Sequence, residues 1–205
     1  MFDFEFLRDN WLFIAAGIGV TLGVAIFSFL LATPLAVMVT KGRRSTLLPI
    51  KALSAFYVWL IDGIPLLLQI FFIFLVLPRF GITLPGFWAG VLVLTLNYGS
   101  RMSNIFYERF AAIGKSQGEA WISLIKPLTN EFIGMIKDST LISLTGLIQD
   151  VYWRANRLGR AEFRNLEAFT MAAIIYLILI TIISLGSKAI RTTIATSESG
   201  TGDSP

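Results

Sequence analysis

The chain contains no cysteine and no histidine, and few of its residues are charged. Of its 205 residues, 15% are charged and 55% are hydrophobic. The missing cysteines exclude disulfides and thiolate metal sites, and the missing histidines exclude His-ligated haem or chlorophyll and any histidine-based triad. We therefore expect no metal site and no cofactor, although a pigment held by backbone or Asn groups stays open. The apolar fraction is too high for a soluble domain of this length.

Long apolar runs occupy most of the sequence. Trp11 through Thr40 contains no charged side chain. A helix needs about twenty apolar residues to cross a hydrocarbon core of roughly 30 Å. The pattern predicts an all-α integral membrane protein with about five transmembrane helices, at residues 11–40, 52–78, 86–108, 127–149 and 166–188.

The two ends of the chain differ in composition from this apolar body. Residues 1–10 mix phenylalanine with acidic and basic side chains, which is typical of a short interfacial helix. Residues 193–205 are mostly small and polar, which predicts a disordered tail. We therefore expect three parts: an interfacial helix at 1–10, a transmembrane domain at 11–192, and the tail.

We expect the protein to lie in a prokaryotic-type inner membrane, either the plasma membrane or an internal energy-transducing membrane. Basic residues indicate its orientation there. The first connection is rich in them, so the positive-inside rule places it in the cytoplasm, the N-terminus outside and the C-terminus inside. Residues 150–165 carry four arginines yet fall outside by this count, which conflicts with the rule. We assign the net charge of +4 to orientation and expect no nucleic-acid partner. The basic residues of the first connection are Lys41, Arg43, Arg44 and Lys51.

Polar residues recur on one face of the third predicted span. Asn97, Arg101 and Asn104 are spaced by four and three residues, and Tyr98 borders them. A polar stripe on an apolar helix points toward a partner helix or an aqueous cavity. It therefore predicts either a substrate path or an interhelical hydrogen-bond network near one membrane edge.

The fourth predicted span also carries charge, at Lys137 and Asp138, with Asn130 nearer its start. Sequence neighbours diverge around a helix, so each charge needs a partner elsewhere. We expect crossed pairs, Arg101 with Asp138 and Asp62 with Lys137.

Gly63 and Pro65 follow Asp62 within the second predicted span. Together they predict a broken or kinked helix with freed carbonyls. Such breaks occur near transporter sites, and a packing kink is the alternative.

Two enzyme-like patterns fail. Gly114-Lys115-Ser116 ends like a phosphate-binding loop, but Arg109 stands where the first glycine is required. No nucleophile, base and orienting group occur together, so we expect the chain not to be an enzyme.

The polar segments, in order, resemble the permease subunits of ABC importers for polar amino acids. The second span carries Gly-x-Pro-Leu-Leu-x-Gln at residues 63–69, and the fourth carries Asn-x-Phe-Ile-x-x-x-Lys-Asp at residues 130–138. The resemblance covers most of residues 11–190. It implies a type I importer bundle that pairs with a second half, is driven by cytoplasmic ATPases and is supplied by an external solute-binding protein.

Two positions depart from that family's pattern. Asp62 stands where the family has Arg, and Gly118-Glu119-Ala120 is followed by only sixteen residues before Lys137. In the family this interval holds the helix that docks into the ATPase; here we expect that helix to be deleted, and we interpret these three residues as the remnant of a shortened cytoplasmic connection.

Two functions follow. The first is a transport-deficient accessory or scaffold subunit, packed among other transmembrane subunits and membrane lipids in a larger complex. The alternative is a working permease half for polar amino acids, with a substrate path lined by the third and fourth spans. In that case an ATPase and a binding protein are partners.

Overall fold

The computed structural model describes residues 3–111 and 117–200, and the side chains among them except at 110–111, 117–122 and 195–200. Every regular element in these ranges is a helix. The predicted all-α membrane fold is therefore correct.

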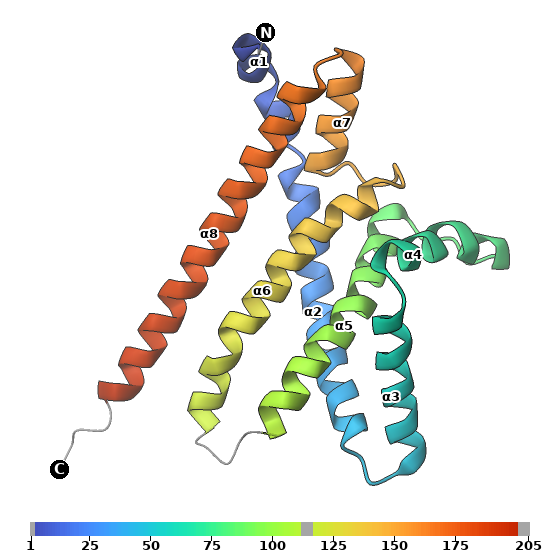
Figure 1. Cartoon of the computed structure of the whole chain (residues 1–205), viewed down its shortest axis with the longest axis vertical. Coiled ribbons are helices and arrows are strands. Elements are labelled where there is room, and N and C mark those ends of the chain that lie inside the picture. Colours follow the sequence, from blue (N-terminus) through green and yellow to red (C-terminus); the bar gives the residue numbers. More distant parts are fainter. Residues whose placement is uncertain (1–2, 112–116, 201–205) are drawn as a thin grey trace.

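Four long helices form the body of the molecule: α2 (Ile18–Arg43), α5 (Gly86–Ala111), α6 (Gln117–Ser143) and α8 (Asn165–Gly200) (Figure 1). The buried face of α2 is small, with Ala25, Ser28, Ala32 and Ala36 all fully buried. Small residues let membrane helices approach closely, and α2 packs along α5 through this face. The core then fills with larger side chains of α5 and α6, such as Leu94, Tyr98, Met102, Met135 and Ile136.

The predicted second span is a bent pair of helices. α3 (Leu48–Gly63) ends before Pro65 and α4 (Leu66–Phe71) follows; α3 and the helical segment Leu66–Phe80 meet at 103°. The chain then continues through a π-helical turn, η1 (Phe72–Val76), and a 3₁₀ turn, η2 (Leu77–Phe80). Proline lacks an N–H and keeps the preceding residue extended, which is the conformation of Ile64. The structure thus has a bend at the Gly63 and Pro65 break that the sequence predicts within the span 52–78.

Two shorter helices gather around the start of α8. α1 (Phe4–Ala15) leads into α2 through Ala16 and Gly17, and α7 (Val151–Ala161) packs on α8 and α1. A Cβ on Gly17 would collide with the backbone at Asp150 and Val151, so only glycine permits this approach. The sequence assigned α7 to a loop. It also placed the boundary of the first helix near residue 10, whereas the helical break lies at residues 16–17.

Two described helices are long and apolar enough to cross a membrane: Phe4–Arg43, taken as one path, and Asn165–Ile194. The bent α3–α4 pair makes up to three. The polar side chains of α5 and α6 lower the mean hydropathy of these helices. The count of five stays a prediction.

Connections that lie far apart in the sequence share one end of the bundle. The α2–α3 turn, the end of α5, the start of α6 and the end of α8 lie toward the same end, opposite the N-terminus and α7 (Figure 1). α8 continues to Gly200, and residues 201–205 lie outside the described ranges, so the disordered tail stays a prediction.

Candidate functional site

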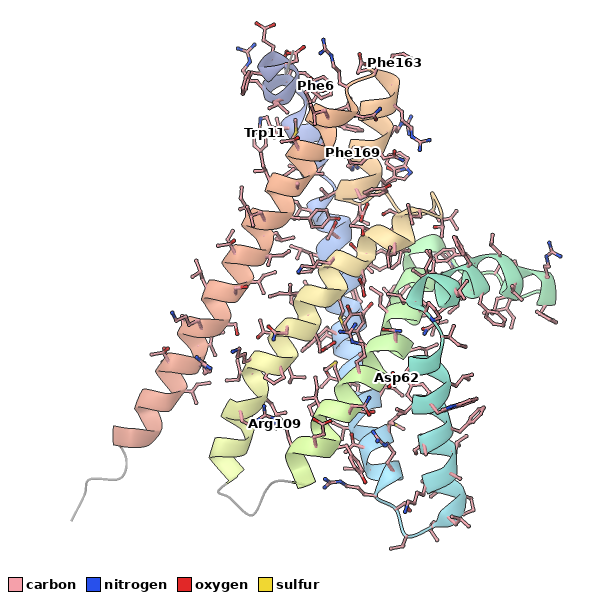
Figure 2. The ribbon with its side chains drawn as sticks, viewed as in Figure 1. Phe6, Trp11, Asp62, Arg109, Phe163 and Phe169 are labelled. Carbon is pink, nitrogen blue, oxygen red and sulfur yellow. The ribbon has the colours of Figure 1, made fainter. Side chains whose placement is uncertain are left out.

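The candidate site is a polar wall on α5 that faces α3 on one side and α6 on the other. Figure 2 places Asp62 between α3 and α5. The Ser100 hydroxyl donates to Asp62 Oδ1 at 2.8 Å, and Asn104 Nδ2 donates to Asp62 Oδ2 at 3.0 Å. Arg43 of α2 donates to Asn104 Oδ1 at 2.7 Å. The Asp62 carboxylate is thus held by two neutral donors, and Arg43 is linked to it through Asn104.

The helix break contributes a second set of contacts. Gln69 Nε2 donates to the carbonyls of Ile61 at 2.8 Å and Ile64 at 2.7 Å, which are freed where α3 ends. Asn97 of α5 donates to Gln69 Oε1 at 3.4 Å. Carbonyls without a hydrogen-bond donor are costly inside a membrane. The Gln69 amide supplies the donor for both carbonyls at the helix break and also connects the break to α5 through Asn97.

The other side of the wall meets α6. The buried Tyr98 hydroxyl donates to Asp138 Oδ2 at 2.8 Å. Arg101 Nε lies 3.0 Å from Glu131 Oε2, and its guanidinium lies 4.7 Å from the centre of the Tyr98 ring. A Cβ on Gly134 would lie 2.5 Å from the Tyr98 hydroxyl oxygen, so this glycine gives the hydroxyl room to reach Asp138.

The crossed pairs expected from the sequence do not form. Arg101 pairs with Glu131, and Asp138 accepts from Tyr98. Lys137 is exposed and has no ion pair among the described residues. The rotation of α6 about its own axis decides these pairings. Residues 131 and 138 lie two turns apart on the same face of α6, so both carboxylates point toward α5.

The remaining predicted site residues lie apart from this wall. Asn130 is exposed toward the start of α6. The backbone of Gly118, Glu119 and Ala120 lies in the first turns of α6. Their side chains, and residues 112–116, lie outside the described part of the structure, so the shortened connection stays a prediction.

The sequence missed a buried carboxylate at the start of α7. Asp150 is fully buried and caps α7 by accepting from the Trp153 N–H at 2.9 Å. The hydroxyls of Ser139 and Tyr176 lie 3.4 and 3.3 Å from its other oxygen. An Asp before an apolar run at helical spacing is a helix-start signal that could have revealed both α7 and its cap.

The wall combines carboxylates, a guanidinium and neutral donors. Such groups could bind a small molecule that carries both charges. Among the described residues, no cluster of three His, Cys, Asp or Glu side chains could hold a metal ion.

No protein-family model matches the chain. Individual relatives do. The L-cystine transport system permease protein TcyB of Bacillus subtilis is 31% identical, over 90% of this chain and 87% of that protein. The arginine transport system permease protein ArtQ of the same organism is 29% identical, over 92% and 95%. That alignment runs over 210 residues, more than the 205 of this chain, so ArtQ has residues without a counterpart here.

A solved structure shares the fold. The crystal structure of an amino acid ABC transporter with histidines superposes with a TM-score of 0.86 at 23% identity, over 94% of this chain and 99% of that one. A permease bundle is therefore the fold of this protein. Because relatives of this similarity match almost the whole chain, the protein belongs to the family of amino-acid ABC transporter permeases.

Proposed function

We propose that this chain is a working transmembrane half of an ABC importer for polar amino acids. The observation that carries the proposal is the wall on α5, which has Asp62 on its α3 side and Arg101 and Asp138 on its α6 side. The relatives are named for transport of arginine and L-cystine, which supports the substrate class. These findings favour the importer over the accessory subunit that was our first expectation.

An amino acid carries an ammonium and a carboxylate, and the wall offers partners for both. The carboxylates of Asp62, Glu131 and Asp138 suit the ammonium, and Arg101 suits the carboxylate. The Arg101 side chain is 47% exposed, whereas Glu131 is 14% exposed, so the guanidinium is the more accessible of the pair. Neutral side chains of the wall, Asn97, Tyr98 and Asn104, orient these groups and complete the path. Exposed Asn130 and Lys137, which directly precede Glu131 and Asp138 in α6, extend it.

A second half would cover the open side of the α5 wall in this assignment. The ATPase would bind at the end that holds the α2–α3 turn and the α5–α6 connection. An external solute-binding protein would bind at the end that holds the N-terminus and α7. Residues 1–10 would lie at the outer membrane surface, residues 11–192 would form the transmembrane unit, and the C-terminus would be cytoplasmic.

Reconstitution tests the function directly. The chain is placed in proteoliposomes with an ATPase, a partner half and a binding protein of an amino-acid ABC importer from the same organism, and uptake of labelled arginine, cystine and glutamine is measured. We expect ATP-dependent uptake of at least one of them. Arg101→Ala should abolish uptake while leaving the assembly intact. Lys51→Ala, a change at an exposed lysine outside the wall, should leave both uptake and assembly unchanged.

The accessory function gives the opposite results. If the chain assembles with these partners and ATP hydrolysis is unchanged by every amino acid and binding protein tested, the proposal is wrong.

A further inference from the structure

A hollow between α6 and α8 is lined by basic side chains and by no acidic one. It has a volume of about 280 Å³, and Lys126 of α6 faces Lys188 and Arg191 of α8 across it. The other polar lining groups are hydroxyls and the Asn130 amide. None of the three cations forms an ion pair with a residue that the structure describes.

A second hollow of about 520 Å³ adjoins the first and shares Lys126 and Arg191 with it. It adds Arg109, which Figure 2 shows near the end of α5. Glu131 also lines this second hollow, but its carboxylate pairs with Arg101 at 3.0 Å. Four cations from three helices therefore line the two adjoining hollows, and Glu131, the one carboxylate among the described lining residues, pairs with Arg101.

The predicted spans place the cations at the depth of lipid phosphates. Arg109 directly follows the predicted span 86–108, Lys126 directly precedes 127–149, and Lys188 ends 166–188. Along α8, the face that carries Lys188 and Arg191 continues toward the membrane centre through Ser184 and Thr181 to the exposed Leu177 and Ile174, at spacings of three and four residues. A positively charged hollow thus adjoins an exposed apolar surface of α8. This arrangement matches the charged head group and apolar acyl chains of a lipid.

We propose that this hollow binds the phosphate of an anionic phospholipid such as phosphatidylglycerol, with its acyl chains along the exposed face of α8. Like charges held close together repel, and a bound phosphate relieves that repulsion. A zwitterionic lipid is a poorer ligand because its own ammonium neutralises its phosphate. The site does not depend on the proposed transport activity.

The test uses the full-length chain purified in mild detergent, with lipid retention counted by native mass spectrometry after addition of dioleoyl phosphatidylglycerol or dioleoyl phosphatidylcholine. We expect preferential retention of phosphatidylglycerol. Lys126→Gln with Lys188→Gln should weaken it by roughly thirtyfold, since each basic residue near an anionic surface contributes about a factor of five. Lys126→Arg with Lys188→Arg keeps the charge and should keep the lipid.

Lys41→Gln with Lys51→Gln is the matched control, because it removes two exposed lysines at the same end of the bundle, outside the hollow. Equal loss in this control, or equal retention of both lipids, would overturn the site. Displacement of phosphatidylglycerol by inorganic phosphate alone would show a simple anion site and overturn the lipid assignment. A change in association with a second copy or the ATPase, with lipid retention unchanged, would show a protein interface instead.

Discussion

At the scale of residues, Gly134 determines how α5 and α6 fit together. Its missing side chain leaves space for the Tyr98 hydroxyl, which reaches past it to Asp138. Glycine within a helix costs about 1 kcal/mol relative to alanine, so its presence here is offset by the contact it permits.

We predict that Gly134→Ala destabilises the protein by about 1–3 kcal/mol through overpacking, less the helix preference of alanine. Thermal unfolding in detergent measures this. Tyr98→Phe removes the atom nearest the new methyl group and should reduce the penalty of Gly134→Ala when the two are combined. Gly19→Ala is the control, because a Cβ at Gly19 meets no atom within 4 Å. Equal destabilisation by both glycine changes would contradict the role of Gly134.

The partner of Arg101 is a second question at this scale. A double-mutant cycle of Arg101→Ala with Glu131→Ala should give a coupling energy of about 1 kcal/mol, because the arginine is half exposed and solvent screens the pair. The same cycle with Asp138→Ala should give a smaller value. A larger coupling with Asp138 would restore the pairing expected from the sequence and contradict the structure.

At the scale of elements, the bend between α3 and α4 depends on Gln69. We predict that Gln69→Leu, which leaves the carbonyls of Ile61 and Ile64 without their donor, loosens the bend and costs about 1–3 kcal/mol for each buried group left unpaired. Because the chain has no cysteine, spin labels at Phe56→Cys and Phe80→Cys report the angle directly. Their distance distribution should broaden in Gln69→Leu and stay narrow in Asn130→Leu. An unchanged distribution would show that packing alone sets the bend.

The elements also show what a single sequence can predict. The apolar runs indicated the membrane helices, and Gly63 with Pro65 indicated the break, because both signals are local. α7 was missed because only one side of this short helix is buried. The partners of Arg101 and Asp62 were wrong because they depend on how α6 is rotated against α5, and packing at Gly134 and Tyr98 influences that rotation. No local pattern encodes it.

At the scale of the whole molecule, the arginines of residues 150–165 conflict with the predicted orientation. In the structure three of the four are engaged within the protein: Arg164 pairs with Asp3 at 3.3 Å and Glu167 at 3.6 Å, Arg157 lies over the Trp153 ring, and Arg154 donates to the Phe13 carbonyl at 3.3 Å. The first connection, which usually dominates orientation, lies at the opposite end (Figure 1).

We therefore predict that a membrane-impermeant maleimide added to whole cells labels Arg160→Cys and spares Lys51→Cys. Both positions are exposed, and the natural chain offers no competing thiol. Lysed cells supply the control, since both variants should then react. Labelling of Lys51→Cys alone in intact cells would invert the topology, and with it the side on which we place the ATPase.

The single amide at position 69 has a mechanical consequence. Gln69, in α4, donates hydrogen bonds to carbonyls at the end of α3, and Asn97 of α5 donates a hydrogen bond to Gln69. If α3 and α4 move apart during a transport cycle, the hydrogen bonds of Gln69 must break. Because Asn97 is bonded to the same side chain, that movement would also shift α5. Infrared spectroscopy of the Gln69 amide would then detect each turnover as the loss and recovery of these hydrogen bonds.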